Sequence, residues 1–281
     1  NVGRTYCYAI TEVQPTIDGN YSTNPDDGLD GATFDAESGR WTYEGVTYDN
    51  STKYVTARVF SEQVTGADSS LIEQVRVDTA GEAEDAAAGE GTAIFTNSYA
   101  AASTTATISV QKTLEGRAWL ETDDFGFVLT PAEAGQPMPA EAQADGEGNV
   151  SATLSFDADA DGYTGTAAGT ELTEAFGTIA YTQADLGMTD AGNPARSKTF
   201  TYYVDETNSD GEGITADAHV ATVTVTVTDN GDGTMSAQVR YANADAPDAA
   251  DAANTGVAAF TNTYTARMDY GAAGGIQVTK Q

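Results

Sequence analysis

Lysine and asparagine recur together in this sequence of 281 residues. The phrase Thr-Asn-(Ser/Thr)-Tyr occurs twice and contains Asn97 in one copy and Asn262 in the other. Each copy is followed, 15 and 18 residues later, by a β-patterned segment with a lone lysine, Lys112 or Lys280, although the chain has only four lysines. Because a neutral lysine amine is a nucleophile, this placement suggests a chemical role.

A third residue type recurs with them. Two alternating aromatic segments, at 6–13 and 200–207, are both predicted to be strands, and each ends in an acid, Glu12 or Glu206. Lysine, glutamate and asparagine therefore recur as a set.

These residues and their order resemble the isopeptide-linkage domains of Gram-positive surface pilins and fibrillar adhesins. The resemblance covers residues 104–266, and more loosely 1–99. In the second half the full series reads VQKTLEGR, DDFGFVLTP, AFGTIAYTQADLG, TFTYYVDE, VATVTVTVTDNGDGT and AAFTNTY. It implies an all-β fold of tandem immunoglobulin-like (Cna B-type) antiparallel β-sandwiches. It also implies a covalent bond from Lys112 on the first strand to Asn262 on the last, with Glu206 as the proton carrier.

Such a bond requires a neutral lysine, since an ammonium has no lone pair with which to attack. Burial beside aromatic rings lowers a lysine pKa, and we expect Phe125, Phe127 and Phe260 to supply that pocket. The same burial raises the pKa of a glutamate, which can then pass protons to the departing ammonia. No cofactor is required, and the protein reacts once instead of turning over.

The elements that must position these residues are predicted to be strands. Two alternating runs flank the glycine turn at 229–233 and predict a hairpin, and 56–64 with 73–77 form a weaker counterpart. Residues 182–187 could make one helical turn, and 80–91 reads as an acidic loop. Short strands separated by turn signals indicate an antiparallel sandwich.

Three segments are expected. Residues 1–100 would be the C-terminal part of one sandwich domain, 104–267 a complete domain, and 268–281 a linker with the first strand of a following domain. The first segment starts in mid-fold, and the lysine that would match Glu12 and Asn97 is absent. Asn97 could then be crosslinked only to a lysine upstream of Asn1 or to one from another copy. Lys280 belongs either to the next domain, which we favour, or to a strand donated to a neighbouring copy.

The composition excludes several partners. A net charge of −31 argues against nucleic acid and against anionic membrane surfaces. The single cysteine, Cys7, cannot form an intrachain disulfide and is expected to be a small buried apolar group. No signal peptide, membrane-length apolar span or C-terminal anchor is recognisable in the sequence. The resemblance implies an extracellular location on a bacterial surface.

The sequence signals for a metal site or a catalytic histidine are weaker than the recurring set of lysine, glutamate and asparagine. Asp157, Asp159 and Asp161 match the opening of a calcium loop, but its twelfth position is Ala168 instead of glutamate. The only histidine, His219, is expected to be an ordinary strand residue, which leaves no Ser-His-Asp or multi-histidine site.

The sequence therefore predicts a structural subunit or repeat of an extracellular pilus or fibre, whose partners are copies of itself or adjacent repeats. The alternative is the stalk or ligand-binding region of a cell-surface adhesin, in which residues 14–44 would be the place to look for binding of a host glycan or protein. A secreted acidic hydrolase is a third possibility. Nothing singles out its carboxylate pair, and Trp41 and Trp119 are too few to suggest a sugar-stacking cleft.

Overall fold

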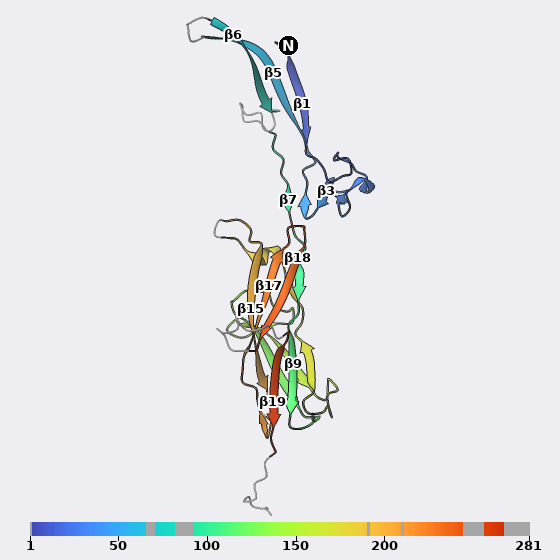
Figure 1. Ribbon diagram of the computed structural model, residues 1–281, viewed down its shortest axis with the longest axis vertical. Coiled ribbons are helices and arrows are strands. Elements are labelled where there is room, and N and C mark those ends of the chain that lie inside the picture. Colours follow the sequence, from blue (N-terminus) through green and yellow to red (C-terminus); the bar gives the residue numbers. More distant parts are fainter. Residues whose placement is uncertain are drawn as a thin grey trace, which may run out of the picture. The chain divides into compact units, whose positions relative to one another are not determined.

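The computed structural model describes residues 2–65, 71–81, 93–189, 192–208, 211–243 and 256–266. These residues form strands, turns and loops with very little helix, so the expectation of a nearly all-β chain is confirmed (Figure 1). The chain divides into two compact units. Unit 1 is Asn1–Ala101 with Gly231–Gly233, and unit 2 is Ala102–Asn230 with Thr234–Gln281. Within the described ranges, no helix has the length and apolarity that a membrane span requires.

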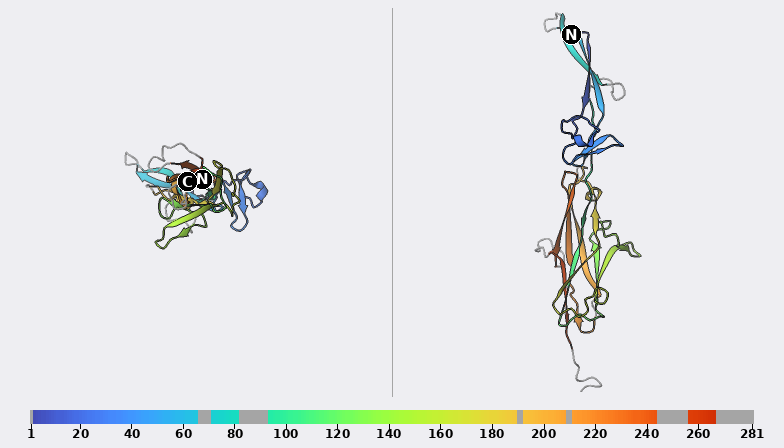
Figure 2. Two further views of the ribbon diagram at one scale, coloured as in Figure 1. Left: turned by 90° about the horizontal axis from the view of Figure 1, so that it is seen from below. Right: turned by 90° about the vertical axis from the view of Figure 1, so that its right-hand side faces the viewer.

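Unit 2 contains two main sheets (Figures 1 and 2). One has the strand order β11-β12-β10-β15-β17-β18 and the other β13-β9-β19-β16, while β14 and β8 form a short pair. The elements are β8 (Thr104–Ala106), β9 (Ser109–Glu115), β10 (Asp124–Pro131), β11 (Gln143–Ala144), β12 (Val150–Asp157), β13 (Glu171–Ala175), β14 (Ile179–Tyr181), α1 (Gln183–Leu186), β15 (Ser197–Asn208), β16 (Ile214–Thr215), β17 (Ala221–Asp229), β18 (Met235–Ala242) and β19 (Ala258–Tyr264).

The core of unit 2 lies between the two main sheets. In β17, Val223, Val225 and Val227 are fully buried and alternate with half-buried or buried threonines, as expected for a strand with one face in a core. Phe127 of β10 packs on Phe260 of β19 with ring centroids 5.1 Å apart, so the facing sides of the two sheets are in contact. The predicted hairpin is confirmed, because β17 pairs antiparallel with β18. The predicted helical turn is α1.

The strands β9 and β19 differ from the antiparallel expectation. They pair in parallel, with Phe260 opposite Lys112 and Asn262 opposite Leu114. Parallel neighbours need a long crossover, and here nearly the whole unit lies between them in the chain. The strand that carries Lys112 and the strand that carries Asn262 are therefore direct neighbours.

Unit 1 has two smaller sheets, in the orders β1-β5-β6 and β2-β3-β4-β7. The predicted long hairpin is confirmed, because β5 and β6 pair antiparallel. The elements are β1 (Thr5–Thr11), η1 (Pro25–Asp27), β2 (Thr33–Asp35), β3 (Arg40–Tyr43), β4 (Val46–Thr47), β5 (Thr52–Thr65), β6 (Leu71–Gly81) and β7 (Ser98–Tyr99).

Two expectations about single residues are wrong. Cys7 is exposed instead of buried. Its neighbour Tyr8 is 55% exposed, whereas Tyr202, which has the same spacing from its glutamate, is fully buried. The reason is that β15 pairs on both sides and faces a second sheet, whereas in the described residues β1 pairs only with β5. His219 lies between β16 and β17 instead of within a strand. Of the predicted acidic loop, residues 82–91 lie outside the described ranges.

Candidate functional site

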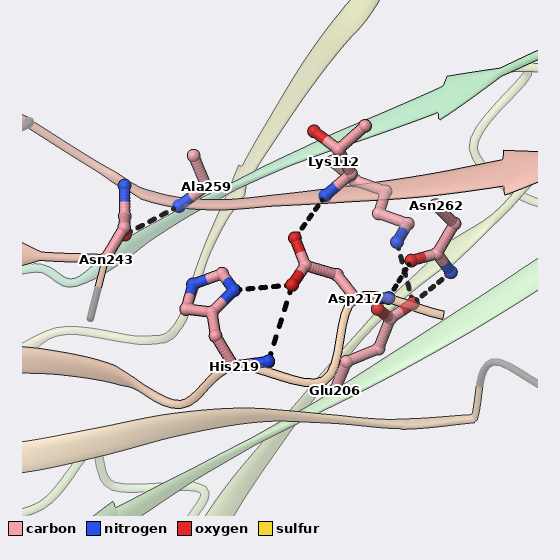
Figure 3. Close-up of polar contacts among 8 residues, drawn as sticks. Lys112, Glu206, Asp217, His219, Asn243, Ala259 and Asn262 are labelled. Carbon is pink, nitrogen blue, oxygen red and sulfur yellow. Dashed lines mark hydrogen bonds and ion pairs between the residues drawn. The ribbon is translucent and has the colours of Figure 1, made fainter. Parts of the chain in front are cut away.

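Three side chains from three strands meet in the core of unit 2 (Figure 3). Lys112 Nζ donates a hydrogen bond to Glu206 Oε1 at 2.7 Å. Asn262 Nδ2 donates to the same oxygen at 2.7 Å. Lys112 and Asn262 are fully buried, and the side chain of Glu206 is 1% exposed. The amine and the carboxamide therefore share one carboxylate oxygen inside a closed core.

Strand periodicity explains how three polar side chains reach the core. Side chains alternate between the two faces of a strand, and Lys112 lies between Val110 and Leu114, which are also fully buried. In the same way Asn262 follows the buried Phe260 by two residues, and Glu206 follows Val204 by two. Each of the three polar residues occupies a position that the pattern assigns to an apolar side chain.

Burial sets the protonation of the pair. Lys112 Nζ lies 4.7 Å from the ring centroid of Phe125 and 5.8 Å from that of Phe127. Desolvation lowers the pKa of Lys112 from its ordinary 10.5 and raises the pKa of Glu206 from 4.5, although their mutual attraction opposes both shifts. Glu206 Oε2 is buried without a hydrogen-bond partner among the described residues, which further disfavours a charged carboxylate. Both shifts favour a neutral amine beside a protonated acid.

The carbonyl end of Asn262 is held by a residue that the sequence did not single out. The backbone N–H of Asp217 donates to Asn262 Oδ1 at 2.8 Å. The carboxylate of Asp217 accepts the N–H of Thr261 at 2.9 Å, so the same aspartate holds the strand next to the asparagine. A repeat in the sequence could have marked this residue, because the series Glu-Gly-(Val/Ile)-Thr-x-Asp ends at Asp49 in one copy and at Asp217 in the other.

Unit 1 contains a similar arrangement around its own glutamate and asparagine. Asn97 Nδ2 donates to Glu12 Oε1 at 2.6 Å, and the N–H of Asp49 donates to Asn97 Oδ1 at 2.8 Å. Asn97 is exposed and Glu12 is half-buried, in contrast with the closed site of unit 2. Lys280, the candidate lysine donor, lies outside the described residues.

A comparison with protein families places most of unit 2 in a known family. The family described as "FctA: Spy0128-like isopeptide containing domain" matches residues 108–265, which is more than half of the chain and includes all three core residues. The chain belongs to this Spy0128-like isopeptide family. The matched region runs from the residue before β9 to the residue after β19, the two strands that carry Lys112 and Asn262.

Solved structures similar to this family member are major pilins of Streptococcus pyogenes. The T-13 major pilin is 16% identical, with a TM-score of 0.34, over 58% of this chain and 54% of that one. Another major pilin is 17% identical, with a TM-score of 0.21, over 78% and 64% respectively. The aligned part of this chain thus spans less than two thirds of either pilin. No curated protein matches the chain.

The remaining candidate residues have structural roles in the described chain. Asp157 Oδ1 accepts the N–H groups of Asp159 and Ala160, and Asp161 Oδ2 accepts the N–H of Asp157, so these carboxylates close a turn. In the described ranges, no group of three acidic, histidine or cysteine residues could hold a metal ion. Trp41, in the segment considered for ligand binding, is fully buried and donates to the carbonyl of Ser22.

Proposed function

We propose that this chain is a structural subunit or repeat of an extracellular bacterial pilus or fibre, stiffened by a self-formed isopeptide bond between Lys112 and Asn262. The observation that carries the proposal is the closed contact of Lys112, Glu206 and Asn262 in the core of unit 2. Membership of the Spy0128-like family and the likeness to major pilins support it. Self-association, or association with adjacent repeats, and a location on the cell surface belong to the same proposal.

In the proposed reaction, neutral Lys112 adds through its lone pair to Cγ of Asn262. Glu206 receives the amine proton and delivers a proton to Nδ2, so the C–N bond of the carboxamide breaks and ammonia leaves. The overall change is amine plus primary amide to secondary amide plus ammonia, with no oxidant, metal or cofactor. Folding holds the groups in place, and such intramolecular reactions gain from high effective concentration.

The proposal includes tandem immunoglobulin-like domains, of which unit 1 forms one member. Glu12 and Asn97 would then act as a second crosslinking pair that takes its lysine from outside the described residues. The exposure of Asn97 and the uncovered face near Tyr8 support this reading. Lys280 of another copy is one such donor.

The decisive experiment is the intact mass of the denatured chain. A mass one ammonia below the sequence value supports the bond in unit 2, and tandem mass spectrometry should find Lys112 joined to Asn262. Two variants serve as controls. Glu206→Ala removes the proton carrier, and Lys112→Met keeps an unbranched apolar side chain beside Phe125 and Phe127 but has no amine. Both should have their full sequence mass, and a wild-type chain of full mass would contradict the proposal.

A further inference from the structure

The carboxamide of Asn262 is held at both ends in unit 2. Its Nδ2 donates to Glu206, and its Oδ1 accepts the backbone N–H of Asp217 at 2.8 Å (Figure 3). This assignment is the only one that satisfies both neighbours, because a rotated amide would set oxygen against oxygen and N–H against N–H. The carbonyl oxygen of the reacting group therefore faces a fixed donor before any reaction.

Asp217 is itself tied to the strand that carries the asparagine. Its Oδ2 accepts the N–H of Thr261 at 2.9 Å, and its Oδ1 lies 2.6 Å from Nδ1 of His219. These hydrogen bonds lower the pKa of Asp217, although burial alone would raise it. The His219 ring stacks on Phe260 at 4.5 Å between centroids. Two bonds between one aspartate and the neighbouring residues Thr261 and Asn262 close a small ring that fixes the direction of the N–H.

The same set of bonds occurs in unit 1. The N–H of Asp49 donates to Asn97 Oδ1 at 2.8 Å, and Asp49 Oδ2 accepts the N–H of Thr96 at 3.0 Å. Asp49 Oδ1 accepts the N–H of Ser51 at 2.9 Å, as Asp217 Oδ1 accepts the N–H of His219 at 3.4 Å. These three bonds correspond, but the N–H of Asp49 also donates to Glu12 Oε2 at 3.2 Å, whereas Glu206 Oε2 has no hydrogen-bond partner among the described residues.

The sequences that lead to the two aspartates repeat the series Glu-Gly-(Val/Ile)-Thr-x-Asp, at 44–49 and 212–217, and differ after it. Residues 49–51 read Asp-Asn-Ser, whereas 217–219 read Asp-Ala-His. Asp49 lies 37 residues after its glutamate and Asp217 only 11 after its own. The arrangement thus recurs together with this short series although the spacing from the glutamate differs, which ties it to the asparagine that it holds.

We propose that Asp217 is a positioning residue for isopeptide formation, and that Asp49 has the same role at the acceptor site of unit 1. This inference rests on the proposed function. When the amine of Lys112 adds to Cγ, the electrons of the carbonyl bond move to Oδ1, which becomes negatively charged. The N–H of Asp217 already points at that atom, so it stabilises the developing charge as an oxyanion-hole donor does. The side chain contributes by holding that N–H in place.

The rate of crosslinking tests this role. The chain is recovered unfolded in denaturant, refolded by dilution, quenched at timed intervals and weighed for the loss of one ammonia. Removing a complete oxyanion donor slows catalysis by about 10²–10³. Asp217→Ala loosens the donor without removing it, so we expect crosslinking at least about tenfold slower. Asp217→Asn keeps an oxygen that can accept the N–H of Thr261 and should recover part of the rate.

Matched controls separate positioning from folding. Asp49→Ala changes the equivalent residue of the other unit and should leave the rate at Lys112 and Asn262 unchanged. Rates are taken only for the folded fraction, which circular dichroism measures. The effect of Asp217→Ala on the fold is measured by thermal unfolding of the Lys112→Met variant and of the double variant Lys112→Met, Asp217→Ala. Neither protein has the amine of Lys112, so a crosslink in unit 2 does not affect the comparison.

The outcomes are distinct. A folded Asp217→Ala chain that crosslinks at the wild-type rate overturns the role of Asp217 but leaves the proposed function intact. Slower crosslinking in a folded chain, partly restored by Asp217→Asn, supports it. If the wild-type chain never loses ammonia, the proposed function fails, and the role of Asp217 fails with it.

Discussion

At the scale of single residues, the proton shared within the Lys112–Glu206 pair decides whether the site can react. Neutral lysine with protonated glutamate holds as many protons as the ion pair does. One more proton removes the nucleophile, and one fewer removes the acid. Because the two groups are coupled, the apparent pKa values belong to the pair.

The rate of crosslinking should therefore follow a bell-shaped pH profile. Burial lowers the pKa of Lys112 from 10.5, so the acid limb should lie well below that value. Burial raises the pKa of Glu206 from 4.5, so the alkaline limb should lie above it. The measurement is the timed loss of ammonia after refolding at a series of pH values. A rate that rises up to the ordinary lysine pKa would show that burial does not set the protonation of this amine.

A second residue-scale prediction concerns the ion pair of Arg117 and Asp123. Nη1 and Nη2 of Arg117 donate to the two oxygens of Asp123 at 2.6 and 2.7 Å. Burial alone would raise the pKa of Asp123, but these bonds outweigh it and lower the pKa below 3.8. A carboxylate with a depressed pKa stabilises the fold above its unfolded pKa, and this contribution is lost as the pH falls through the folded value.

Asp123→Asn should accordingly lower the free energy of unfolding at neutral pH by about 1–3 kcal/mol, the range for hydrogen bonds to charged groups. The difference from the parent should shrink as the pH falls below 3.8. Denaturant titrations in the Lys112→Met background, which cannot crosslink, provide the measurement. Asp159→Asn, at an exposed position, is the matched control and should change little. If Asp123→Asn lowers the free energy of unfolding equally at neutral pH and below pH 3.8, the stabilisation by this ion pair is not electrostatic.

At this scale the sequence predicted which side chains would meet in unit 2 but missed their supporting aspartate. Lys112, Glu206 and Asn262 stand out in the sequence because lysine, glutamate and asparagine recur as a set whose order resembles that of isopeptide-linkage domains. Asp217 acts through its backbone N–H, so its residue type does not suggest this role, but the series Glu-Gly-(Val/Ile)-Thr-x-Asp, repeated at 44–49 and 212–217, could have marked it. Cys7 was misjudged for a related reason, because alternation places a residue on a face but does not say whether that face is covered.

At the scale of elements, the parallel pair β9–β19 is the part of unit 2 that brings the lysine beside the asparagine. The hairpins β5–β6 and β17–β18 could be predicted, because turn residues and alternating runs are local signals. The pairing of β9 with β19 joins segments about 150 residues apart, and no local signal specifies its direction or register. Only the resemblance to isopeptide-linkage domains implied that these two strands would be neighbours.

The end of β9 depends on Gly116. Its φ is +87°, and a Cβ there would lie 2.2 Å from the carbonyl oxygen of Tyr264 at the end of β19. Gly116→Ala should therefore cost about 1–2 kcal/mol for the left-handed backbone and more for the contact with Tyr264. We expect a lower denaturation midpoint in the Lys112→Met background. Gly146→Ala, where the added Cβ meets nothing within 4 Å, should leave the midpoint nearly unchanged. Equal effects of the two changes would contradict the argument.

At the scale of the whole molecule, the bond between Lys112 and Asn262 would change how the chain carries tension. The two residues lie 150 positions apart, near the two ends of unit 2 in the sequence. A covalent link between them keeps the enclosed residues out of the path of the force. Closing a loop of this length also stabilises a fold by about 5 kcal/mol in the chain-entropy estimate for disulfides.

Stretching single molecules by their ends tests this directly. When unit 2 unfolds without a crosslink, the 150 residues from Lys112 to Asn262 are released, which adds about 500 Å of extended chain at ~3.3–3.6 Å per residue. Wild-type molecules should lack this step, because the bond bypasses the enclosed chain, whereas Lys112→Met should show it. Steps from unit 1 should be the same in both proteins and serve as the internal control. A wild-type step of about 500 Å would mean that the force passes through the folded strands and not through a covalent bond, and the chain would then lack the property that suits it to a fibre.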